Sequence, residues 1–140
     1  MTEGRARTSV LLGLIGAGLQ ASLTPALHEG EGAAQGISLV YRRIDLDRLR
    51  LGPEALPDLL VAAERVGFDG LNITYPCKQT VIPLLDELSE DARALGAVNT
   101  VLLRYGRRIG HNTDCSGFAE NSRRGRPHSA RQRVVLLGAG

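Results

Sequence analysis

Short apolar runs alternate with helical segments along the first half of the chain, and glycine or proline marks the boundaries between them. Strands are predicted over residues 9–15, 37–44 and 70–74, and helices over residues 24–35 and 53–66. Two parallel strands need a long connection such as a helix, so this order favours neighbouring strands that run in the same direction. The pattern therefore predicts the α/β fold class, with a mainly parallel open sheet and flanking helices.

The second half of the chain adds a hairpin. Residues 99–104 and 108–112 are strand candidates, and the segment Tyr105-Gly106-Arg107 between them is typical of a tight turn. Because a hairpin reverses the chain, it supplies one antiparallel strand to the sheet. Further helical segments are expected over residues 80–88, 89–95 and 114–124. Thr24 and Asp114 are the predicted N-caps of the helices that they begin.

The end of the sequence reads as the start of a second domain. Residues 122–133 are rich in arginine, glycine, proline and serine, which is typical of a helix end and a linker. An apolar strand candidate follows and ends in a glycine turn, but a strand without a partner does not complete a domain. We therefore expect a tail over residues 1–8, one domain over residues 9–125, and a linker with the first strand of a truncated domain over residues 126–140.

The composition, 43% hydrophobic and 23% charged, is that of an ordinary globular domain. The segment from Arg104 to Gly140 contains eight arginines and only two acidic residues, but such a basic run is more often a solvated turn and linker. No nucleic-acid partner is predicted, and a basic nucleic-acid binder is kept only as an alternative. The two cysteines and three histidines lack metal-site spacing, so no metal is predicted.

The apolar run at residues 10–15 follows two arginines and resembles the core of a signal peptide. It is interrupted by Gly13 and is far shorter than a membrane span. We therefore predict a cytoplasmic protein without a membrane partner.

Two glycine turns follow apolar strand candidates. Gly16-Ala17-Gly18 fits the dinucleotide-binding pattern G-x-G-x-x-A, with Asp45 after the next strand. That pattern requires a helix that begins at the glycines, whereas Pro25 would disrupt such a helix. We interpret this turn as a loop and keep a dinucleotide-binding domain as an alternative. Gly138 and Gly140 are the better candidates for a cofactor-binding turn.

Lys78 is the only lysine in the chain, against sixteen arginines. An arginine cannot release its proton at working pH, whereas the pKa of a partly buried lysine shifts readily. We interpret Lys78 as a group that transfers a proton or binds a hydroxyl. The alternative is that one lysine survived a general preference for arginine by chance.

Four segments place small polar groups after predicted strands, where the crevice of an open α/β sheet binds ligands. Each group could instead cap a helix or satisfy a turn amide. The segments contain Ser-x-Thr-Pro, Asn-Ile-Thr-x-Pro-x-Lys, Gly-Ala-Val-Asn-Thr and Gly-x-Asn-Thr-Asp-x-x-Gly-Phe, at residues 22–25, 72–78, 96–100 and 110–118. Together and in this order, the four motifs resemble the N-terminal substrate-binding domain of the shikimate/quinate dehydrogenase family.

The resemblance implies roles for individual residues. Ser22 and Thr24 would hold the substrate carboxylate, whereas Thr74, Asn99 and Asp114 would bind ring hydroxyls. Lys78 would be the catalytic lysine, paired with Asp114 at the hydroxyl that is oxidised. NAD or NADP would be bound mainly by the missing C-terminal domain, whose first turn would contain Gly138 and Gly140. The substrates would be shikimate, quinate or their 3-dehydro forms. The resemblance leaves open whether the protein forms a homodimer.

Departures from the family pattern keep the substrate open. The common shikimate-specific form has serine where Thr24 stands, and threonine resembles the branch that also accepts quinate. An aminoshikimate-type dehydrogenase and a non-catalytic binding module for a cyclic hydroxy acid are the alternatives. The fragment alone is expected to bind substrate weakly without turning it over.

Overall fold

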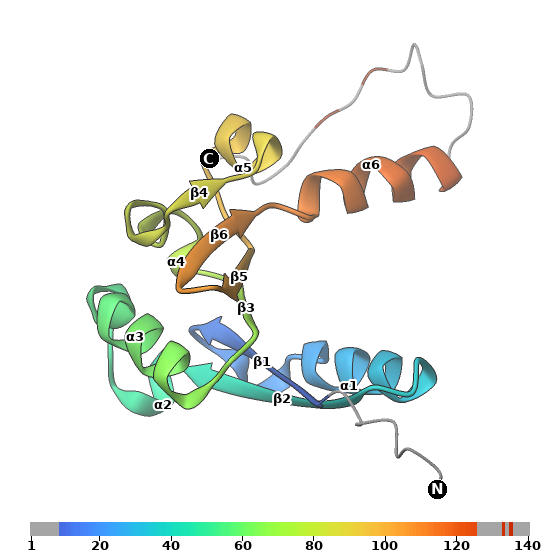
Figure 1. Ribbon diagram of the computed structural model, residues 1–140. Coiled ribbons are helices and arrows are strands. Elements are labelled where there is room, and N and C mark those ends of the chain that lie inside the picture. The colour runs from blue at the N-terminus through green and yellow to red at the C-terminus, as the bar shows by residue number, and fades with distance from the viewer. Residues whose placement is uncertain (1–8, 126–132, 134, 136–140) are drawn as a thin grey trace, which may run out of the picture.

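The computed structural model describes residues 9–125 together with residues 133 and 135, and their elements surround one six-stranded sheet (Figure 1). The strands are β1 (Ser9–Gly16), β2 (Ser38–Asp45), β3 (Gly70–Ile73), β4 (Glu87–Leu88), β5 (Thr100–Arg104) and β6 (Arg107–His111). The helices are η1 (Leu19–Ala21), α1 (Thr24–Ala34), α2 (Leu46–Leu49), η2 (Pro53–Ala55), α3 (Leu56–Val66), α4 (Cys77–Thr80), η3 (Ile82–Leu84), α5 (Glu90–Leu95) and α6 (Asp114–Gly125). The predicted tail lies outside the described residues, as do Gly138, Gly140 and all of the predicted linker and strand except residues 133 and 135.

The sheet has the strand order β2-β1-β3-β5-β6-β4. Strand β1 pairs in parallel with β2 and β3, and β4 pairs in parallel with β6. Strand β5 runs antiparallel to both of its neighbours, β3 and β6. The described sheet therefore has one antiparallel strand, and the predicted fold class is confirmed. The turn after β5 has positive φ at Tyr105 (53°) and Gly106 (70°), and Tyr105 is 99% exposed.

The prediction of one helical piece over residues 80–88 is wrong. This segment contains the end of α4, the short η3 and strand β4. Pro83 lacks an amide hydrogen and restricts the residue before it, so the helix cannot continue. The backbone after η3 pairs with β6 instead, because the Asp86 amide donates to the Arg108 carbonyl (2.9 Å) and the Ser89 amide to the Gly110 carbonyl (2.8 Å).

Two predicted helix caps are also wrong. Thr24 is already the first residue of α1, and its amide donates to Ser22 Oγ at 3.3 Å. Asp114 is likewise the first residue of α6, and the amides of Asp114 and Cys115 donate to Asn112 Oδ1 at 3.0 and 3.4 Å. In both cases a polar residue two positions earlier accepts the amide hydrogen, so the side chains of Thr24 and Asp114 are not used as caps.

Helices α1 and α3 pack on opposite faces of the sheet. Successive side chains of a strand point to opposite faces, and the adjacent residues Leu14 and Ile15 of β1 follow this rule. Ile15 belongs to the larger core with Leu60 of α3, whereas Leu14 packs with Tyr41 of β2 on the other face. Gly32 of α1 lies against that second face, because a Cβ there would be 2.8 Å from Leu39 Cβ. Among the helices of the described residues, none has the length and apolar character that a membrane span requires.

A paired charge joins α3 to β6. Arg108 Nε donates to Glu64 Oε1 at 2.6 Å, and a terminal nitrogen of the same guanidinium donates to Oε2 at 2.9 Å. These hydrogen bonds, more than the attraction of opposite charges, lower the pKa of Glu64, and burial opposes them. We expect Glu64→Gln to reduce the free energy of unfolding at neutral pH by about 2 kcal/mol, because it weakens a two-bond charged contact. Chemical denaturation measures this difference.

The stability lost in Glu64→Gln should depend on pH in a defined direction. A carboxylate whose pKa is lower in the folded state stabilises the fold above its ordinary pKa of about 4.3. That contribution is lost as the pH falls through the lower folded value, so the two proteins should converge in acid. Asp58→Asn, at an exposed position in the first turn of the same helix, should cost less than about 1 kcal/mol, the usual effect of one charge at a helix start. A difference between wild type and Glu64→Gln that grows in acid would contradict this assignment.

Candidate functional site

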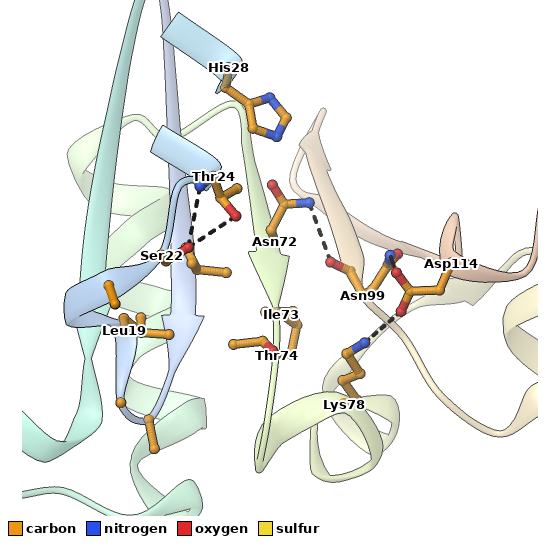
Figure 2. A pocket seen from close by; sticks show the side chains of 14 residues that line it. Leu19, Ser22, Thr24, His28, Asn72, Ile73, Thr74, Lys78, Asn99 and Asp114 are labelled. Atoms are coloured by element: carbon orange, nitrogen blue, oxygen red, sulfur yellow. Dashed lines mark hydrogen bonds and ion pairs between the residues drawn. The ribbon is translucent and has the colours of Figure 1, made fainter. Parts of the chain in front are cut away.

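A cavity of about 470 Å³ lies at the carboxyl ends of β1 and β3, beside the beginning of β5 and α6 (Figure 2). Because β5 is antiparallel, the residues that precede it lie at the same edge of the sheet as the residues that follow β1 and β3. All six side chains predicted to bind substrate line this one cavity: Ser22, Thr24, Thr74, Lys78, Asn99 and Asp114. The structure therefore brings together residues that span more than 90 positions of the sequence.

The glycine turn after β1 packs tightly on the segment after β3. The Ala17 amide donates to the Tyr75 carbonyl at 2.9 Å. A Cβ on Gly16 would collide with the methyl group of Thr74 and lie 2.8 Å from the Tyr75 carbonyl oxygen. This contact holds Thr74 at the edge of the cavity. The close packing alone requires a glycine at position 16, so no bound nucleotide is needed to explain it. In addition, no long helix follows the turn until α1 begins at Thr24.

Asp45, the acidic residue of the apparent dinucleotide pattern, has local partners. Its carboxylate accepts hydrogen bonds from the Leu19 amide (3.1 Å), the Gln20 side chain (2.6 Å) and the Asp47 amide (3.1 Å). Burial raises its pKa, but these hydrogen bonds together outweigh that effect and the pKa is lowered. Asp45 thus fixes the loop that leads to Ser22.

Ser22 and Thr24 form a hydroxyl pair at one end of the cavity. Ser22 Oγ donates to Thr24 Oγ1 at 3.1 Å, and the Ser22 backbone carbonyl accepts from Arg43 at 2.8 Å. These contacts place two hydroxyl groups side by side on the approach to α1. Because the Ser22 hydrogen is used within the pair, the Thr24 hydroxyl is left to donate to an anionic oxygen, such as one oxygen of a carboxylate.

Lys78 and Asp114 form an ion pair on another wall of the cavity. Lys78 Nζ lies 2.5 Å from Asp114 Oδ2, and the two side chains are 36% and 57% exposed. The hydrogen bond from Lys78 lowers the pKa of Asp114, although partial burial opposes it. Asp114 is therefore a carboxylate at neutral pH. An ammonium group has three donors, so Lys78 can bind Asp114 and still reach a ligand oxygen.

Asn99 is 9% exposed, and protein partners satisfy its whole side-chain amide. The amide nitrogen donates to Thr113 Oγ1 and Asp114 Oδ1, both at 2.9 Å. The amide oxygen accepts from Thr100 Oγ1 and from the Thr113 backbone amide, both at 3.0 Å. Asn99 therefore orients the carboxylate of Asp114, and any ligand that it binds must replace one of these four bonds.

The cavity also contains two polar residues that the predicted set of site residues lacks, Asn72 and His28. Asn72 lies in the same motif as Thr74, and its side chain links Tyr41 to Thr100 through bonds of 2.6 and 3.1 Å. His28 follows Thr24 by four residues on α1, and this helical spacing is the signal that could have identified it.

The arrangement suits a small, polyhydroxylated carboxylic acid. Hydroxyl donors lie at one end, neutral amides lie between, and an ion pair that can hold or move a proton lies on another wall. The Thr74 hydroxyl makes no hydrogen bond within the part of the chain that the structure describes, so a ligand can use it. Across residues 9–125, 133 and 135, no three His, Cys, Asp or Glu side chains gather as a metal site.

Known proteins are similar to this chain in sequence and in fold. The family model for the shikimate dehydrogenase substrate binding domain matches residues 14–101. Shikimate dehydrogenase (NADP(+)) of Streptomyces avermitilis is 58% identical over 94% of this chain and 45% of its own length. Quinate/shikimate dehydrogenase (NAD(+)) of Corynebacterium glutamicum is 56% identical over 94% of this chain and 47% of its own.

A solved structure agrees with these matches. Quinate dehydrogenase from Corynebacterium glutamicum in complex with NAD superimposes with a TM-score of 0.88, at 55% identity, over 95% of this chain and 48% of that one. The chain thus spans about half the length of the curated relatives that it matches.

Proposed function

Because the chain belongs to the shikimate dehydrogenase substrate-binding domain family, we propose that it is the substrate-binding part of an NAD- or NADP-dependent shikimate or quinate dehydrogenase. The observation that carries the proposal is a single cavity that joins the Ser22–Thr24 hydroxyl pair to the Lys78–Asp114 ion pair. The whole protein would interconvert a ring alcohol and its 3-dehydro ketone. The cytoplasmic location and a homodimer stay predictions.

The proposed binding mode places the substrate carboxylate at Ser22 and Thr24, and ring hydroxyls at Thr74, Asn99 and Asp114. For Asn99, the bond most readily exchanged for a substrate hydroxyl is the one to the Thr113 side chain, because its loss leaves Asp114 oriented. Thr24 in place of serine supports acceptance of quinate as well as shikimate.

In the proposed reaction, Lys78 moves the proton of the alcohol. Oxidation removes a hydride from the carbinol carbon only as the hydroxyl proton departs, so a general base must lie at that oxygen. In this direction the neutral amine of Lys78 accepts the proton and becomes the ammonium, and in the reverse reduction the ammonium returns the proton to the substrate oxygen. Asp114 holds the Lys78 nitrogen at 2.5 Å and fixes its direction. When bound, NAD or NADP supplies the hydride acceptor.

The Thr74 side chain and the Tyr75 backbone carbonyl pack against Gly16, which supports a structural role for this turn rather than a cofactor site. The proposed cofactor turn at Gly138 and Gly140 lies outside the described residues. We therefore expect the isolated 140-residue chain to bind the hydroxy acid, to bind NAD(P)H negligibly, and to show no turnover.

The test is a titration of the isotope-labelled chain with shikimate and quinate, followed by amide NMR. We expect shifts at residues around the cavity, and much smaller ones with cyclohexanecarboxylate at the same concentration, because that acid keeps the carboxylate but lacks the ring hydroxyls. Absence of any response to shikimate and quinate would refute the proposal. Binding without turnover in a protein that also carries the nucleotide-binding domain would favour the non-catalytic binding module.

A further inference from the structure

His28 lines the cavity one helical turn after Thr24, on the same face of α1. Figure 2 shows its ring at the opposite end of the view from Lys78. The imidazole stacks on the Tyr41 ring, with the ring centroids 4.8 Å apart and the planes inclined by 19°. Neither imidazole nitrogen has a hydrogen-bond partner among the described residues, so both are available to a ligand.

Tyr41 is a fixed platform for this ring. It is 5% exposed, and its hydroxyl donates to Asn72 Oδ1 at 2.6 Å. Burial raises the pKa of Tyr41, so the hydroxyl keeps its proton and remains a donor. Asn72 is held in turn by Thr100 Oγ1 at 3.1 Å. Because the stacked rings are nearly parallel, the imidazole nitrogens point along the Tyr41 face rather than into it.

The hydroxyl pair beside His28 has too few donors for a carboxylate. Ser22 Oγ donates its hydrogen to Thr24 Oγ1, and the Thr24 amide donates to Ser22 Oγ. One hydroxyl hydrogen of the pair is then free for a ligand, whereas a carboxylate has two oxygens with about four acceptor sites. An additional donor on this wall would complete the binding of the anion.

We propose that His28 is a specificity-determining residue that donates a hydrogen bond from its imidazole to the carboxylate of the substrate, beside Ser22 and Thr24. The proposal rests on the proposed function, because it assumes that a cyclic hydroxy acid occupies the cavity. The chemistry that His28 selects is the anionic group, not the ring hydroxyls.

The test compares His28→Phe with wild type, using shikimate and its methyl ester as probes and calorimetry on the 140-residue chain. Phenylalanine keeps the stacking on Tyr41 and removes both nitrogens. We expect about tenfold weaker binding of shikimate, the effect of one hydrogen bond to a charged group, and less than about twofold change for the ester. His28→Gln, which restores a donor, should recover part of the affinity. Leu27→Ala, at an exposed neighbouring position, should have no effect.

The outcomes separate the two proposals. If wild type binds neither shikimate nor quinate, the proposed function fails. If wild type binds shikimate and His28→Phe binds it equally well, or loses affinity for acid and ester alike, the role of His28 is refuted. A measurement on wild type needs no folded variant: the imidazole nitrogen signals of His28 should shift with shikimate and stay in place with the ester. Equal shifts with both probes would overturn the inference.

Discussion

Replacing Lys78 with arginine should lower kcat by about a hundredfold or more and change KM far less, because proton transfer is lost while binding is retained. A guanidinium keeps the positive charge beside Asp114 and can still donate to a substrate oxygen, but it cannot release a proton. The ion pair in the structure, 2.5 Å between Nζ and Oδ2, places the ammonium where this difference matters. Steady-state kinetics of shikimate and quinate oxidation, measured on the proposed whole protein with its nucleotide-binding domain, give both parameters.

A second variant separates charge from proton transfer. Lys78→Met removes the cation as well, so KM should rise in addition to the fall in kcat. The pKa of Asp114 should also move back toward its ordinary value, because the hydrogen bond from Lys78 is the main cause of its lowering. Near-normal kcat in Lys78→Arg would refute proton transfer by Lys78. It would leave Lys78 as a binding group only.

The second large effect is expected from Gly16→Ala, which should destabilise the fold by about 3 kcal/mol through overpacking. The added methyl group would collide with the Thr74 methyl and approach the Tyr75 carbonyl oxygen to 2.8 Å. Part of that contact is backbone, which cannot rotate away. The segment after β3 would have to move, and it carries Thr74 and Lys78 into the cavity. We therefore expect a lower Tm and weaker binding of shikimate in the same variant, measured by thermal denaturation and calorimetry.

Gly30→Ala is the matched control for Gly16→Ala. Gly30 lies inside α1 and has open space where its Cβ would be, so alanine should stabilise the helix by about 0.5–1 kcal/mol. The same pair of variants tests the dinucleotide alternative. If wild type bound NAD(P)H tightly, and Gly16→Ala lost that binding at an unchanged Tm, the turn after β1 would be a cofactor site after all.

The elements that were predictable from the sequence have local causes. The helices that end near Gly36 and Gly67 meet residues with φ of 71° and 91°, a backbone region that favours glycine. Strand β4 was missed because its two residues become a strand only by pairing with β6, about twenty positions further along the chain. No periodicity within residues 80–88 contains that information.

In the candidate site, too, features with local causes were predictable and features that depend on distant segments were not. Ser22, Thr24 and Lys78 were recognisable because short motifs fix their neighbours along the chain. The four-bond environment of Asn99 was not, since three of the bonds are made with Thr113 and Asp114, in the connection after β6 and at the start of α6. The stacking of His28 on Tyr41 depends on how α1 crosses β2, although its four-residue offset from Thr24 was present in the sequence.

The reversed direction of β5 has a practical consequence for handling the protein. Because β5 starts beside the cavity, the turn at Tyr105 and Gly106 lies at the opposite edge of the sheet, and Tyr105 is 99% exposed. A tether attached there would hold the domain on a sensor surface with the cavity directed toward the solution. The chain has no tryptophan to report on ligands by its own fluorescence, and binding measured on the tethered protein would leave the cavity open to ligands in solution.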